Sequence, residues 1–151
     1  MLRRFAVCVA SAVIALMPGV VADAAADDSQ SVRTQSGKVR CLANSNDVGH
    51  GGGPLVVCQR WSGEPFAQSP YSAEHRERLN LAVVRANGDF YWNIGNIPGS
   101  AEATANDLVL NYGQTYHVNG WAILSTFDGT RFKHDGTGHG MFVSIDNVNP
   151  F

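Results

Sequence analysis

The dipeptide Asn87-Gly88 restricts the fold more than any other feature, because it separates two apolar runs, LAVVRA and DFYWNI. Asn-Gly favours a two-residue type I′ turn, in which both residues adopt positive φ angles. The expected pairs across this turn are Arg85 with Phe90, Val83 with Trp92 and Leu81 with Ile94. Side chains two positions apart lie on the same face of a strand, so we expect all six on one face of a hairpin.

A second hairpin is predicted around Asp128-Gly129, between the segments WAILSTF and TRFKH. This turn pairs Phe127 with Thr130, Ser125 with Phe132 and Ile123 with His134. The same register is expected to place four large side chains on one buried face: Trp121, Ile123, Phe127 and Phe132.

Further short strands are predicted at residues 38–42, 55–61, 108–110, 116–118 and 141–148. The helix signal lies at residues 72–78, where Ser72 can cap the first turn and Glu74 with Arg78 forms an i,i+4 pair. Many short strands joined by frequent turns are typical of sandwiches and barrels. We therefore expect an all-β fold, a small antiparallel sandwich or barrel with one short helix and one disulfide.

The N-terminal 24 residues have the order of a secretory signal peptide: basic Arg3-Arg4, an apolar run, and the small-residue site Ala22-x-Ala24. A membrane anchor is the alternative, but the apolar run is shorter than the ~20 residues that span a bilayer. Residues 25–36 are small and polar and predict a flexible N-terminal tail. Residues 37–151 are then expected to form a single all-β domain, secreted or held in the cell envelope.

Charge excludes two classes of partner. Loss of Arg3, Arg4 and Asp23 with the signal peptide lowers Lys+Arg from 11 to 9 and Asp+Glu from 13 to 12, so the net charge becomes −3. A nucleic-acid binder needs a stripe of basic residues that replaces phosphate counterions. Docking on an anionic membrane likewise needs a positively charged surface. We therefore expect no nucleic-acid partner and no electrostatic docking on an anionic membrane. No second apolar run is long enough to span a membrane, so no membrane span is expected after signal removal. The domain is expected to be a monomer.

Two of the three cysteines remain after signal removal, because Cys8 lies within the signal peptide. Oxidation is favoured in an exported chain, and two thiols allow one intramolecular pairing, Cys41 with Cys58. The alternative is a pair of free thiols. The spacing does not fit a Cys-x-x-Cys redox site, and the count does not fit a four-cysteine zinc site.

The run His50-Gly51-Gly52-Gly53 has the letters of the loop that supplies an oxyanion hole in some esterases. Those enzymes also need a Gly-x-Ser-x-Gly elbow in a mostly parallel sheet, and this pentapeptide does not occur in the sequence. The run also lies inside the loop that the disulfide closes. We therefore expect it to be structural, with the glycines allowing the chain to turn back towards Cys58.

The clearest candidates for catalysis are His134, Asp135 and His139, in the segment KHDGTGHG. A metal site would need three or four convergent ligands, and the spacing of the two histidines matches no zinc pattern, so no metal or cofactor is expected. A catalytic triad assembled across the fold remains an alternative. Exposed aromatic side chains would instead indicate a binding surface for glycans or proteins.

The predicted signal peptide is followed by four notable segments: Arg40-Cys41, Val57-Cys58-Gln59-Arg60, Gly120-Trp121 and the closing TGHGMFVSI at residues 137–145. In these features the chain resembles small exported proteins of mycobacteria and related actinobacteria. The resemblance implies no particular activity and carries over no catalytic residue.

The function expected from these observations is a non-enzymatic binding or interaction module with a protein or glycan partner. The alternative is a small secreted hydrolase with its site near His134, Asp135 and His139. A third hypothesis is a protease inhibitor that presents the disulfide-closed loop. A binder predicts an exposed aromatic patch, a hydrolase predicts a histidine beside a carboxylate, and an inhibitor predicts an extended loop between Val48 and Pro54.

Overall fold

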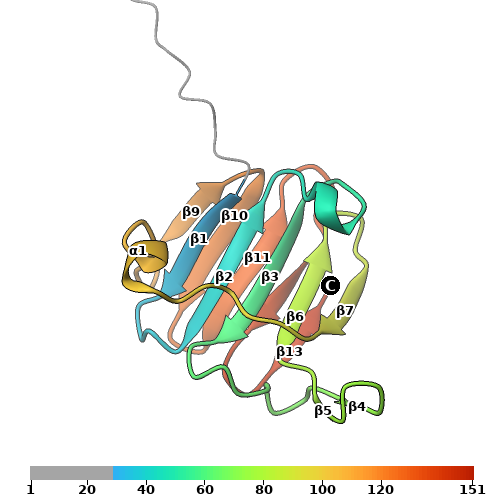
Figure 1. Ribbon diagram of the computed structural model, residues 1–151. Coiled ribbons are helices and arrows are strands. Elements are labelled where there is room, and N and C mark those ends of the chain that lie inside the picture. The colour runs from blue at the N-terminus through green and yellow to red at the C-terminus, as the bar shows by residue number, and fades with distance from the viewer. Residues whose placement is uncertain (1–28) are drawn as a thin grey trace, which may run out of the picture.

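The computed structural model describes residues 29–151, which form a sandwich of two β-sheets (Figure 1). The first sheet has six strands in the order β7-β6-β3-β2-β1-β8. Their bounds are β1 Ser29–Thr34, β2 Val39–Asn44, β3 Leu55–Arg60, β6 Leu81–Arg85, β7 Phe90–Asn93 and β8 Leu108–Leu110. Neighbouring strands are antiparallel, except that β1 and β8 run parallel.

The second sheet has five antiparallel strands in the order β13-β12-β11-β10-β9. They are β9 Thr115–Val118, β10 Trp121–Thr126, β11 Gly129–His134, β12 Gly140–Val143 and β13 Val148–Pro150. A small separate pair joins β4 Tyr71–Ser72 to β5 Glu77–Arg78. The predicted all-β fold with one short α-helix and one disulfide is confirmed, and its two sheets make it a sandwich.

The main core lies between the two sheets. Trp121, Ile123 and Phe132 are fully buried there, as the second predicted hairpin required. They pack against buried residues of the six-stranded sheet, which include Val32, Val56 and Val84. Burial of such side chains stabilises the fold by roughly 1.5–3 kcal/mol each, so this layer is the main source of stability.

A second, smaller core covers the outer face of the six-stranded sheet. Leu55, Leu81 and Val83 point away from the sandwich interior and pack under Ile97. Ile97 belongs to the segment between β7 and the helix α1, Ala101–Thr104, which crosses the front of the sheet over β6, β3 and β2 (Figure 1). We call residues 94–100 the strap. Strands β3 and β6 are therefore buried on both faces, which explains their nearly continuous apolar sequences.

The register of the first hairpin differs from the prediction by one residue. Val84 pairs with Phe90 and Val83 with Tyr91, because the turn has three residues, 86–88, and Gly88 alone carries a positive φ. The two hydrogen bonds that close it are Gly88 N–H to Arg85 C=O and Arg85 N–H to Asp89 C=O. A one-residue slip moves a side chain to the other face. The prediction of a single face for all six residues was therefore wrong: Phe90 and Trp92 face the main core, while Leu81 and Val83 face the strap.

The second hairpin is shifted by two residues, which preserves the faces but moves the turn. Ser125 pairs with Thr130 and Ile123 with Phe132, so the turn consists of Phe127 and Asp128. The predicted burial of Phe127 was wrong, since this side chain is 86% exposed. Gly129 is needed for close approach, because a Cβ there would lie 2.4 Å from Phe142 Cζ. The sequence Asp-Gly therefore marks a tight strand contact here, one position beyond the turn.

Three other expectations are corrected. Residues 29–34 of the predicted flexible tail form β1, in which Val32 is fully buried between β2 and β8, so the domain begins before residue 37. Residues 72–78 form the β4–β5 hairpin, and the short helix lies at 101–104 instead. The predicted strand 141–148 is divided into β12 and β13 by a turn closed by Ser144 N–H to Asn147 C=O.

The predicted signal peptide, residues 1–24, lies outside the described residues, as do residues 25–28. Within residues 29–151, no helix has the length and apolar character needed to cross a bilayer.

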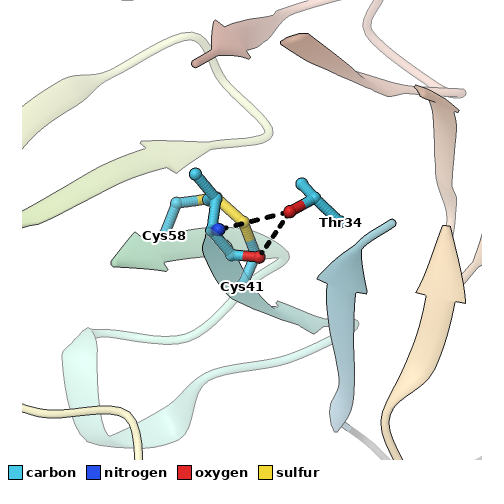
Figure 2. The surroundings of a disulfide bond; sticks show 4 residues. Thr34, Cys41 and Cys58 are labelled. Atoms are coloured by element: carbon cyan, nitrogen blue, oxygen red, sulfur yellow. Dashed lines mark hydrogen bonds between the residues drawn. A yellow bond between two sulfur atoms is a disulfide. The ribbon is translucent and has the colours of Figure 1, made fainter. Parts of the chain in front are cut away.

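The predicted disulfide between Cys41 and Cys58 is confirmed. The two cysteines are direct partners in the β2–β3 ladder, with their Cα atoms 4.1 Å apart, and both are buried in the main core. Beside them, the Thr34 hydroxyl donates to Val39 C=O and accepts from Val39 N–H, each at 3.2 Å (Figure 2). The disulfide and this bridge tie β2 to both of its neighbouring strands.

Replacement of both cysteines by alanine is expected to lower the free energy of unfolding by about 3 kcal/mol, because the bridge closes a loop of 17 residues in the unfolded chain. Denaturant melts of the double variant and the parent protein measure this difference. The control is thiol titration of the denatured, unreduced parent protein beginning at residue 25, which is expected to find no free thiol. An equal midpoint in both melts would contradict a stabilising bridge.

Candidate functional site

The side chains of His134, Asp135 and His139 do not hydrogen-bond to one another within residues 29–151. His134 Nδ1 lies 3.3 Å from the Thr137 hydroxyl, and His139 Nδ1 lies 3.4 Å from the carbonyl oxygen of Phe151. Asp135 instead lies 3.6 Å from Nδ1 of His117. The side chains of the three predicted residues therefore have three different partners, although the backbone N–H of His134 donates to the carbonyl oxygen of His139. Among residues 29–151, no group of three or more His, Cys, Asp or Glu side chains is placed to hold a metal ion.

The glycine run after His50 has no free backbone donor for an oxyanion. The N–H groups of His50 and Gly52 both bond to Asp47, Gly51 N–H bonds to Val48 C=O, and Gly53 N–H bonds to the Asn46 side chain. The loop begins with the short 3₁₀ helix η1, Val48–His50, so it is compact and lacks the extended conformation expected of an inhibitor. This geometry supports the structural interpretation of the run.

The guanidinium group of Arg85 fixes this loop to β6. It donates hydrogen bonds of 2.6 Å to the carbonyl oxygens of His50 and Gly52. Asp47 Oδ1 lies 3.0 Å from His50 Nδ1. Burial acts to raise the pKa of Asp47, but hydrogen bonds from His50 and Asn44 and the charge of His50 outweigh it, so the pKa lies below its ordinary value. The carboxylate therefore stays ionised at neutral pH.

A large pocket opens at the opposite end of β2, where four turns meet. Its volume is about 540 Å³. It is lined by the β1–β2 turn, the start of the β8–β9 loop, the β10–β11 turn and the β12–β13 turn. We call this pocket the turn-end site. The residues of the site that carry the argument below are Lys38, Tyr112, Phe127, Asp128, Thr130 and Asn147.

Aromatic side chains stand at the rim of the turn-end site. Phe127 projects from the β10–β11 turn, and the ring of Tyr112 meets it edge to face with centroids 6.0 Å apart. An adjoining pocket of about 310 Å³ shares Lys38 and Ile145 with the site and is lined by Trp61, which is 49% exposed. Clusters of exposed large apolar side chains often mark contact surfaces, so this cluster is a candidate binding surface.

Polar groups complete the turn-end site. Thr130 lies in its floor, only 1% exposed, and no group among the described residues hydrogen-bonds its buried hydroxyl. An unpaired buried hydroxyl is unfavourable by roughly 1–3 kcal/mol, so a ligand that pairs with it gains affinity. Asp128 and Asn147 are exposed at the rim and offer a carboxylate and an amide.

The sequence interpretation missed the turn-end site. A turn at Asp128-Gly129 predicts that Phe127 lies in the core, whereas the turn consists of Phe127 and Asp128. The other lining residues come from turns far apart in the chain, so no single segment of the sequence indicates the site. Gly129 is required for close approach of the strands, and only the structure distinguishes such a glycine from a turn glycine.

No protein-family model, curated protein or solved structure matches this chain.

Proposed function

We propose that this protein is an exported binding module that holds a glycan at the turn-end site. The observation that carries the proposal is the pair of exposed rings of Tyr112 and Phe127 at the rim of a pocket whose floor contains the unpaired hydroxyl of Thr130. A sugar presents an apolar face that stacks on an aromatic ring and hydroxyl groups that bond to threonine, asparagine and carboxylate side chains. The chemistry of the site matches both needs.

The charges of the site favour a neutral glycan. The single positive charge of Lys38 is outnumbered by the carboxylates of Asp128 and Asp146, and all three are exposed lining residues of the turn-end site. A strongly acidic polymer would meet two carboxylates, and a protein partner would be expected to need a larger apolar area than two rings. A neutral saccharide satisfies these carboxylates as a hydrogen-bond donor.

Export is supported by two observations. The disulfide between Cys41 and Cys58 belongs to the class of bonds that persist in oxidising compartments outside the cytosol. The first 24 residues have the sequence order of a signal peptide. We place the module outside the cytoplasmic membrane, in the cell envelope or the medium.

Phe127→Ala is expected to weaken glycan binding by at least tenfold, about 1.4 kcal/mol, because it removes the most exposed aromatic anchor of the site. The measurement is calorimetric titration with soluble oligosaccharides of neutral hexoses, pentoses and N-acetylated amino sugars. Tyr71→Ala is the matched control, because Tyr71 is 65% exposed and lines neither the turn-end site nor the adjoining pocket that contains Trp61.

Thr130→Val tests the floor of the site in the same titrations. The variant is expected to bind more weakly while the free energy of unfolding stays equal or rises, because valine has a similar shape and the hydroxyl has no partner in the free protein. A parent protein that binds none of the three classes would overturn the proposed function. Binding that is unchanged in both Phe127→Ala and Thr130→Val would show that the glycan binds elsewhere than at the turn-end site.

A further inference from the structure

A second cavity lies on the outer face of the six-stranded sheet, between the strap and the loop that contains η1. Its volume is about 160 Å³. The floor is made by apolar side chains of β2, β3 and β6, among them Leu42, Val57 and Val83, and the strap residue Ile97 closes one side. We call it the strap pocket. The proposed glycan site leaves it unused.

The strap is held so firmly that the cavity is a preformed feature of the fold. Gln59 Oε1 accepts from Ile97 N–H at 2.7 Å in the middle of the strap. Asn80 bonds to both the N–H and the C=O of Gly95, at 3.1 and 2.9 Å. At the other end, the guanidinium group of Arg40 bonds to the carbonyl oxygen of Pro98. The strap therefore cannot drop onto the sheet and fill the space beneath it.

The rim of the strap pocket is polar. Asn93 and Asn96 line it, and each side-chain oxygen already accepts a hydrogen bond, from Ile94 N–H and from Gln59 Nε2. Their amide nitrogens therefore remain to donate to a ligand. Asp47 and His50 line the same cavity and form a hydrogen-bonded pair.

Size and charge together define the occupant. An apolar cavity of about 150 Å³ takes one benzene-sized molecule. The amide donors of Asn93 and Asn96 select a hydroxyl or carbonyl oxygen as its polar end. No lysine or arginine is among the lining residues of the strap pocket, and the carboxylate of Asp47 already lies against His50, so an anionic head group finds no free counter-charge there. We infer that the strap pocket binds a small uncharged molecule with one apolar ring or short branched chain and a hydroxyl or carbonyl group.

The test uses benzyl alcohol as the neutral probe and benzoate as its anionic counterpart. In methyl-resolved NMR spectra of the exported chain, benzyl alcohol is expected to cause saturable shifts confined to the methyl groups that line the cavity, those of Leu42, Leu55, Val57, Leu81, Val83 and Ile97. Benzoate is expected to bind at least tenfold more weakly. Shifts that do not saturate, or that spread over both cores, would overturn the site, and equal binding of the two probes would overturn the neutral ligand.

Val57→Phe provides the second arm, because Val57 is half-buried and lines the cavity, so a larger ring fills the space. Binding of benzyl alcohol is expected to be lost. Val109→Phe is the matched control on the exposed surface of β8, and Phe127→Ala separates this site from the turn-end site; both are expected to bind as the parent does. Parent-like binding by Val57→Phe would contradict the inference, whatever the outcome of the glycan titrations.

Discussion

Trp121→Ala is expected to lower the free energy of unfolding by about 3–5 kcal/mol. Trp121 is fully buried between the two sheets, and its indole N–H donates to the carbonyl oxygen of Asn44 at 3.3 Å, across the sandwich. Its ring also meets that of His134 edge to face, at 5.1 Å between centroids. The substitution leaves a cavity that neither sheet can close, because both are fixed by their ladders. Urea melts followed by circular dichroism measure the loss.

Trp61→Ala is the matched control for this prediction. Trp61 is half exposed at the other end of the sandwich, so its truncation is expected to change stability by less than about 0.5 kcal/mol. A loss below about 1 kcal/mol for Trp121→Ala would mean that the interior repacks freely, against the burial described above.

Arg40→Met is expected to lower the free energy of unfolding by a similar amount, about 3–5 kcal/mol, because it leaves a buried carboxylate without its partner. Arg40 holds Asp107 through two hydrogen bonds, of 2.8 and 2.7 Å, and neither side chain is more than 5% exposed. The same guanidinium group bonds to the carbonyl oxygen of Ala103 at 3.0 Å. Arg76→Met, at an exposed position of the β4–β5 turn, is the control and is expected to be nearly neutral.

The ion pair also makes stability depend on pH. Burial acts to raise the pKa of Asp107, but hydrogen bonds from Arg40 and Ser31 and the charges of Arg40 and Arg33 outweigh it and hold the pKa below the ordinary 3.8. Since the folded state binds this proton more weakly than the unfolded state, the contribution is complete above about pH 5 and disappears as the pH falls through the folded-state pKa. The stability difference between the parent and Asp107→Asn is therefore expected to shrink as the pH falls below about 5. A constant difference would show that the pair does not titrate with unfolding.

The corrected hairpin illustrates how tertiary contacts override local preference. Asn87-Gly88 favours a two-residue turn, yet the chain adds Ala86 to the turn. The N–H of Ala86 bonds to Pro54 C=O at 3.0 Å, and its carbonyl accepts from the Thr137 hydroxyl. These bonds come from two distant loops, so no local pattern contains them. They decide which face Phe90 and Trp92 take.

The first strand was missed for a related reason. In β1 only Val32 is fully buried, and the remaining residues are polar or only half-buried, so no apolar alternation appears in the sequence. The strand forms because β2 and β8 both offer it backbone partners. Backbone pairing of this kind is invisible to side-chain periodicity.

The sequence by itself determined the all-β class, most strand positions and the pairing of Cys41 with Cys58, because these depend on local periodicity and on a count of two thiols. Only the tertiary structure decided the hairpin registers, the two-sided burial of β3 and β6, and the places of both pockets. The turn-end site brings together residues as distant as Lys38 and Asn147, and the strap pocket joins His50 to Ile97. The turn-end site depends on which turns meet at one end of the sandwich. The strap pocket depends on the strap, whose contacts form only when the sheet beneath it is complete.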